Sequence, residues 1–244
     1  YTKDGIVSNG DDCGWVDSVV LTSSQPQVLA DLVHRWSFNG DLTDSAGGQT
    51  ATAVGNVTAS STQYTLSGGV RGSSYINLGA NVLPNDGSPV TLEMWVTQWS
   101  YQYYARIWDF GNTGEDDMYM GLFATYSDRD SIVFRNSGVV EEAELLAPYT
   151  KGTEFYIAVV MTPLSTGRWK LDFYKKNSNG VTLKSYSATT TVSGWTLQGR
   201  TQAQCYLGHA ISDANDANAS YNEFRIWKKA MTEAELTASA IAGP

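Results

Sequence analysis

Apolar and polar residues alternate with a period of two along much of the chain from Leu32 onward. The alternation is clearest in residues 92–97, 155–161 and 169–174. Successive side chains of a β-strand point to opposite faces, so each segment is predicted to be a strand that buries one face. The opposite faces also carry large aromatic residues, and we expect these to be partly covered or used for binding: Trp95, Tyr156 and Tyr174.

Two stretches near the ends of this region predict one closed domain. Residues 32–45 and residues 221–227 each combine a strand pattern with carboxylates and amides. If these first and last strands pair, they close a single sandwich, and a chain of this length commonly forms one such domain. We therefore predict an all-β fold over residues 31–244 that forms one closed sandwich.

Two local signals refine this prediction. The sequence Asn-Ser-Asn-Gly at residues 177–180 is typical of a hairpin turn. Thr232 and Glu235 have the spacing of a capping box, in which each side chain bonds a free amide at the start of a helix. One short C-terminal helix is expected, ending near Gly243 and Pro244.

Residues 1–30 form a separate N-terminal arm in this interpretation. Two short strand patterns surround a Ser-Asn-Gly turn, and a Ser/Gln/Pro linker follows. Two strands bury too little surface to be stable alone. The segment around Trp15 resembles the closing strands of a preceding module in a surface protein. Alternatively, the arm adds strands to another copy of the chain and so allows self-association.

Composition and charge restrict the partners. The chain has 244 residues and a formal net charge of −9, which disfavours nucleic acid and anionic membranes and favours a neutral or cation-bridged ligand. No run approaches the roughly 20 apolar residues that cross a bilayer, so membrane insertion is not expected. The start has neither Met nor a signal-peptide pattern, and Tyr1 is expected to begin a processed or trimmed chain.

Five segments together resemble one family. In chain order they are residues 36–48, 75–79, 90–96, 206–208 and 221–227. Their order and spacing are similar to those of concanavalin A-like, laminin G-like sandwich domains. The resemblance covers roughly residues 32–242 and implies a two-sheet antiparallel jelly-roll sandwich. It implies an extracellular or cell-surface module for binding or adhesion, often with a glycan or protein partner and often with calcium; some relatives are glycoside hydrolases.

Calcium is the first chemical hypothesis. Calcium prefers six to eight oxygen ligands, which loops with carboxylates and carbonyls provide. The resemblance implies a structural calcium close to where the first and last strands meet. As an alternative, Asp44 caps its own turn and Glu223 pairs with Arg35 or Arg225. The candidate ligands are four residues of these strands: Asp41, Asp44, Asn222 and Glu223.

A sugar site is the second hypothesis. Tyrosine and tryptophan rings stack on the C–H faces of sugars, and neighbouring Asp and Asn side chains bond the hydroxyls. Residues 99–112 combine these types. As an alternative, the segment is a hairpin whose aromatic residues cover the sheet. The candidate ligand-binding residues are Trp99, Tyr101, Tyr103, Tyr104, Asp109 and Asn112.

Catalysis is disfavoured by the pattern of carboxylates. Retaining glycoside hydrolases need two carboxylates close together on one face of a sheet. Residues 115–117 lack that spacing, and residues 141–144 lack surrounding aromatic residues. Glu93 has no second carboxylate on its strand.

The cysteines and histidines leave two choices open. Cys13 and Cys205 form a disulfide if the chain is secreted, or else Cys205 is a buried free thiol. His34 and His209 lack metal or triad spacing with either cysteine, and we expect a structural role for both.

The sequence thus favours a secreted or surface-attached, non-catalytic module that binds a glycan or a surface partner and is stabilised by calcium. The alternatives are a structural subunit joined through its N-terminal arm and, third, a glycoside hydrolase of the same fold.

Overall fold

The computed structural model describes residues 30–100, 102, 104–121, 129–136, 139–146, 150–190 and 196–244. Residues 31–244 form one compact unit, distinct from residues 1–30. The predicted N-terminal arm lies almost wholly outside the described residues, so its strands and its role in self-association stay predictions.

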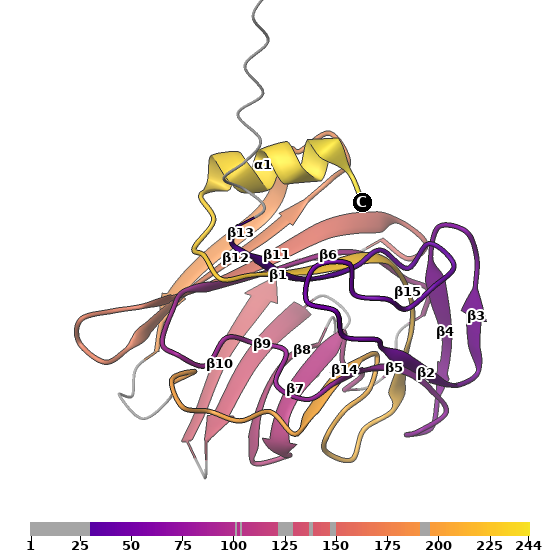
Figure 1. The fold of residues 1–244 in the computed structure, drawn as a ribbon, viewed down its shortest axis with the longest axis horizontal. Coiled ribbons are helices and arrows are strands. Elements are labelled where there is room, and N and C mark those ends of the chain that lie inside the picture. The colour runs from indigo at the N-terminus through magenta and orange to yellow at the C-terminus, as the bar shows by residue number, and fades with distance from the viewer. Residues whose placement is uncertain are drawn as a thin grey trace, which may run out of the picture. The chain divides into compact units, whose positions relative to one another are not determined.

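Two antiparallel sheets pack face to face (Figure 1). The larger sheet has the order β13 (Thr182–Thr189), β12 (Trp169–Lys176), β11 (Glu154–Pro163), β6 (Val90–Gln98), β15 (Asp216–Trp227), β4 (Tyr64–Gly69) and β3 (Val57–Ala59), with β1 (Leu32–Trp36) also paired to β15. The smaller sheet has the order β10 (Val139–Leu146), β9 (Arg129–Asn136), β8 (Asp116–Gly121), β7 (Trp108–Thr113), β14 (Gln204–Leu207), β5 (Ser74–Gly79) and β2 (Thr52–Gly55). The all-β sandwich predicted from the sequence is confirmed.

The first and last strands pair as predicted. In the register of β1 and β15, Trp36 lies opposite Phe224 and Arg35 opposite Arg225. Arg35 donates from Nε and Nη2 to the two carboxylate oxygens of Glu223, at 2.7 and 3.0 Å. Arg225 also donates to Glu223. One buried carboxylate therefore links both strands through two guanidinium groups.

The core lies between the two sheets. Phe224 of β15 packs against Trp36 of β1 and Phe110 of β7, with ring centroids 6.1 Å apart in both pairs. Phe110 in turn packs against Trp108. The inward positions of β6, β11 and β12 are all buried in this core, which confirms the period-two prediction for these strands.

The helix α1 (Glu233–Ala242) covers the outer face of the larger sheet (Figure 1). The capping box of Thr232 and Glu235 begins it, and Gly243 ends it, as predicted. Leu236 and Ala240 pack on the sheet beside Trp95. The aromatic second face of these strands is therefore covered by the helix. In the described part of the chain, no helix has the length and apolar content needed to span a membrane.

A buried carboxylate anchors this second layer. Glu93 of β6 accepts hydrogen bonds from the Tyr156 hydroxyl, at 2.5 Å, and from the indole nitrogen of Trp227. The three side chains come from adjacent strands and are almost inaccessible to solvent. Because Glu93 is paired in this way, its position opposite the core set is structural.

Replacing Tyr156 with Phe removes one donor from a buried carboxylate and keeps the ring. We expect Tyr156→Phe to lower the free energy of unfolding by about 1–3 kcal/mol. Tyr186→Phe is the matched control, because Tyr186 is on the edge strand β13 and 39% exposed; a change within about 0.5 kcal/mol is expected there. Urea unfolding of both variants measures the difference, and equal stabilities would contradict the role of Glu93.

Candidate functional site

The structure assigns Asp44 to a turn. Its carboxylate accepts the backbone amides of Arg35, Ala46 and Gly47 and lies 2.6 Å from His34 Nδ1. Burial opposes ionisation, but the hydrogen bonds from the Arg35 amide, His34 and the turn outweigh it and lower the pKa of Asp44. The alternative role for Asp44, a cap of its own turn, is therefore what the structure contains.

The other candidate calcium ligands also have partners. Glu223 pairs with both Arg35 and Arg225, as its alternative role stated. Asn222 donates to Glu154, at 3.1 Å, and Asp41 accepts the amide of Thr43. Within the described ranges, no three carboxylate, histidine or cysteine side chains are grouped as metal ligands. Calcium binding itself stays a prediction.

The candidate sugar-binding residues lie in different places. Trp99 follows β6 and is 43% exposed, and its indole nitrogen donates to Ser220 Oγ on the outer face of the larger sheet, at 2.7 Å. Asp109 is fully buried in β7 of the smaller sheet, and Asn112 lies near the end of that strand. Tyr104 lies in the connection between the two sheets. The other two candidates lie outside the described residues: Tyr101 and Tyr103.

The cysteine prediction is also incomplete. Cys205 of β14 is buried in the core, and burial raises the pKa of its thiol to about 12. Cys13 lies outside the described residues, so the disulfide between them stays a prediction.

Two tyrosines lie together on the outer face of the smaller sheet. Tyr75 of β5 and Tyr206 of β14 come from adjacent strands, and their ring centroids are 5.3 Å apart. The next residues of the two strands, Ile76 and Leu207, point into the core, so the tyrosines point outward. Both tyrosines are partly exposed. Asn77 and Gln204 share this outer face by alternation. We call Tyr75, Asn77, Gln204 and Tyr206 the tyrosine face.

His209 contacts both rings of the tyrosine face. Its ring stacks on Tyr75 at a centroid distance of 4.2 Å and meets Tyr206 edge-on at 4.9 Å. Its Nδ1 lies 2.6 Å from the carboxylate of Asp216, which is buried. The structural role expected for His209 agrees with these contacts, which hold the two tyrosine rings in place.

A polar cleft adjoins the tyrosine face. The Tyr206 hydroxyl donates to Gln204, at 3.0 Å, and Gln204 donates to the carbonyl of Asn112, at 2.9 Å. Asn112 also lines the cleft, which has a volume of about 280 Å³. Its lining is almost wholly polar: Asn112, Asp116, Asn136, Thr196, Gln198, Gly199, Arg200 and Thr201.

The cleft is held rigidly and is close to neutral. Asn112 Nδ2 donates to the carboxylate of Asp116, at 2.8 Å, and to the carbonyl of Thr201, at 3.0 Å. Arg200 pairs with Asp116 at 2.7 Å, so the two charges cancel. Amides, hydroxyls and one paired carboxylate are the groups that bond sugar hydroxyls, and the adjoining rings offer stacking surfaces.

Of the sequence-predicted ligand residues that the structure describes, Asn112 is the one that belongs to this surface. Tyr75 and Tyr206 were missed, although both alternate with core positions in strands that the sequence indicated. The available signal was an aromatic residue at a strand position whose side chain points away from the core. That these two strands are neighbours depends on the sheet order, because they are separated by most of the chain.

No family model and no curated protein matches the sequence. Solved structures do have a similar fold. Domain 4 of AbnA, a GH43 extracellular arabinanase from Geobacillus stearothermophilus solved with arabinotriose, matches 85% of this chain and 97% of its own, with a TM-score of 0.63 and 20% identity.

Binding domains of botulinum neurotoxins are also similar in fold. That of neurotoxin DC, solved with rat synaptotagmin II, has a TM-score of 0.68 at 10% identity, and it covers 88% of this chain and 52% of its own. The same domain was solved with SialylT, at a TM-score of 0.66 and 12% identity, covering 88% of this chain and 51% of its own. The chain thus spans about half the length of these toxin domains. At such identities the likeness concerns the sandwich fold.

Next to the tyrosine face, the same sheet carries a buried ionic cluster. Asp109 of β7 and Asp117 of β8 lie near Arg106 and Arg135, each acid with one nitrogen–oxygen distance of 3.8 Å. Tyr119 lies between the two guanidinium groups, whose central carbons are 3.5 and 4.9 Å from its ring centroid. Among the described residues, three carboxylate oxygens of this cluster accept no hydrogen bond.

Burial perturbs both acids. It raises the pKa of Asp117 to about 6, against the opposing charges of Arg135 and Arg106. Burial, reinforced by the charge of Asp117, raises the pKa of Asp109 well above its ordinary value. Because neither acid is accessible to solvent, the cluster affects stability more directly than it affects a ligand.

The cluster predicts an unusual dependence of stability on pH. An acid with a higher pKa in the folded than in the unfolded protein binds its proton more tightly when folded, so the free energy of unfolding falls as that proton is lost. For Asp117 the fall spans pH about 4 to about 6. We expect Asp117→Asn to remove this part of the fall and to be about 1–3 kcal/mol more stable at pH 7.

Chemical denaturation of the wild type and the variant at pH 4, 5, 6 and 7 measures this effect. Asp213→Asn is the control, because Asp213 is an exposed loop residue. Identical pH profiles for wild type and Asp117→Asn would contradict the buried cluster.

Proposed function

We propose that this chain is a non-catalytic carbohydrate-binding module of the laminin G-like type. The observation that carries the proposal is the tyrosine face, which joins two partly exposed rings to the polar cleft through Gln204 and Asn112. In this proposal a sugar ring stacks on Tyr206, and its hydroxyls bond Gln204 and the residues of the cleft. The solved complexes of similar fold with arabinotriose and with SialylT support a saccharide ligand.

The charges favour a neutral glycan. The chain has a net charge of −9, which repels anionic sugars at long range. Inside the cleft, the pairing of Arg200 with Asp116 leaves no net charge to attract an acidic group. A neutral oligosaccharide has the alternating C–H and hydroxyl surfaces that rings and amides recognise.

The positions of the described carboxylates support binding without hydrolysis. A retaining hydrolase presents two carboxyl groups about 5 Å apart to its substrate. Asp109 and Asp117 share the outer face of the smaller sheet, but both are inaccessible to solvent. Asp116, in the cleft, is engaged by Arg200 and Asn112. An extracellular location is part of the proposal, supported by the extracellular arabinanase that carries the similar domain.

A glycan array of neutral and acidic oligosaccharides tests the proposal on the full chain. For the best neutral ligand, we expect Tyr206→Ala to weaken binding about tenfold or more, because it removes a central stacking ring. Tyr186→Ala is the matched control, since Tyr186 is exposed on the edge of the other sheet, and it should bind like the wild type. Binding that is unchanged in Tyr206→Ala would contradict the proposed face.

Trp99 marks an alternative location for the glycan-binding site. Its ring is exposed, and Ser220, which fixes its indole nitrogen, also bonds Thr65 at 2.8 Å. If Trp99→Ala abolishes binding and Tyr206→Ala does not, the glycan binds on the larger sheet. Our proposal instead predicts that Trp99→Ala keeps the affinity within about twofold.

A further inference from the structure

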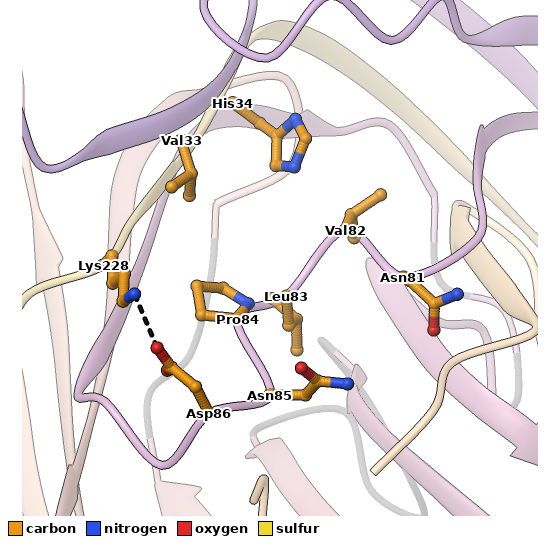
Figure 2. Close-up of a pocket in the computed structure, with 9 residues that line it drawn as sticks. All are labelled: Val33, His34, Asn81, Val82, Leu83, Pro84, Asn85, Asp86 and Lys228. Carbon is orange, nitrogen blue, oxygen red and sulfur yellow. Dashed lines mark ion pairs between the residues drawn. The ribbon is translucent and has the colours of Figure 1, made fainter. Parts of the chain in front are cut away.

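A second hollow lies at the edge of the larger sheet, beside β1. Figure 2 shows its residues, which come from β1, from the segment 81–86 and from the residue that follows β15. It has a volume of about 360 Å³, within the range of small-ligand sites. We call it the His34 groove; its lining is Val33, His34, Asn81, Val82, Leu83, Pro84, Asn85, Asp86 and Lys228.

The imidazole of His34 is fixed in one orientation. Its Nδ1 lies 2.6 Å from the buried carboxylate of Asp44, and its ring stacks on Trp36 at a centroid distance of 5.2 Å. Gly47 packs closely against the ring, because a Cβ there would collide with His34 Nδ1. The buried carboxylate and the stacked ring therefore orient the imidazole together.

This arrangement leaves one nitrogen for a ligand. Since Nδ1 bonds the carboxylate, Nε2 is the ring nitrogen left for a ligand, and an imidazole nitrogen without a proton accepts a hydrogen bond. Figure 2 shows the ring directed toward the space that Val33, Val82 and Pro84 surround. A preoriented acceptor above an apolar floor is suited to a hydroxyl donor on a ligand with an apolar face.

The groove carries no unbalanced charge. Lys228 Nζ and the carboxylate of Asp86 form an ion pair, at 2.6 Å, at its side (Figure 2). The carboxylate of Asp44, behind the ring, is paired with His34. Neither a cationic nor an anionic ligand therefore finds a free counter-charge among the lining residues.

We propose that the His34 groove is a second ligand site, which takes one neutral hydroxylated ring, such as a monosaccharide unit, through a hydrogen bond to His34 Nε2. The site is distinct from the tyrosine face. Segment 81–86 separates it from the polar cleft: the Leu83 amide donates to Gln202, at 2.9 Å, and the Gly199 amide to the carbonyl of Asn85, at 2.7 Å. A module with both sites binds two sugar units at once.

The two histidines of the chain report the two sites separately. Both bond an Asp carboxylate through Nδ1 at 2.6 Å, but His34 faces the groove and His209 supports Tyr75 and Tyr206. In long-range ¹H–¹⁵N spectra of the full ¹⁵N-labelled chain, L-arabinose, D-galactose and D-glucose are titrated singly, with D-galacturonate as the charged comparator. We expect the Nε2 signal of His34 to shift saturably with at least one neutral sugar.

Two groove-filling variants make the assignment specific. Pro84→Trp and Val33→Phe add bulk to the groove and leave His34 in place; melting curves identify the variant that folds like the wild type. The His34 shift should disappear in that variant, while any His209 shift remains. A His34 shift that survives filling of the groove would overturn the proposal.

The remaining outcomes separate this proposal from the proposed function. If only His209 responds, the tyrosine face binds sugar and the groove proposal is wrong. If only His34 responds, the groove binds and the tyrosine face does not. A His34 shift with D-galacturonate alone overturns the neutral ligand, and no His34 shift with any sugar overturns the groove site altogether.

Discussion

The carboxylate of Glu223 lies between the guanidinium groups of Arg35 and Arg225, and this contact joins the first strand of the sandwich to the last. Glu223 is almost fully buried, so its charge requires both partners. The pairing sets β1 in register beside β15, which is also hydrogen-bonded to β4 and β6. One carboxylate and two arginines therefore add a side-chain link to the backbone pairing of β1 with β15.

Both proposed sites depend on these two strands. β1 positions His34 above its groove, and the turn that follows supplies Asp44 to orient the ring. At its other end, β15 supplies Asp216, which accepts His209 Nδ1 and the amide of Ser74 at 2.8 Å. His209 stacks on the ring of Tyr75, so β15 also helps to position the tyrosine face.

Local patterns predicted the fold because each one records a single physical requirement. Alternation in residues 92–97 separates the face toward the core from the face under the helix, and the spacing of Thr232 and Glu235 reflects the free amides at the start of α1. The candidate site was less predictable. The meeting of Tyr75 with Tyr206 depends on the sheet order, which no local pattern contains.

The carboxylates show the same limit. Asp109 follows Trp108 in an aromatic and polar segment that is typical of sugar sites. In the fold, however, Asp109 is buried beside Asp117. Asp44 and Glu223 have the chemistry of calcium ligands, but backbone amides and arginines nearby in the fold are their partners. Residue type indicated the chemistry available, and tertiary contacts decided its use.

Charge is distributed unevenly over the smaller sheet. Asp109 and Asp117 are buried near Arg106 and Arg135, while the adjoining cleft presents amides, hydroxyls and one neutralised ion pair. A polar surface without net charge is suited to neutral hydroxylated ligands, and the described carboxylates of the cluster and the cleft are buried or paired. This distribution of charge supports our proposal of carbohydrate binding without catalysis.

The most direct test is a crystal structure of the full chain with the neutral oligosaccharide that it binds most tightly. The sugar is predicted to lie on the smaller sheet, with one ring stacked on Tyr206 and hydroxyls within hydrogen-bond distance of Gln204 and Asn112. A sugar bound instead over Trp99 on the larger sheet, with the tyrosine face empty, would contradict the proposed site.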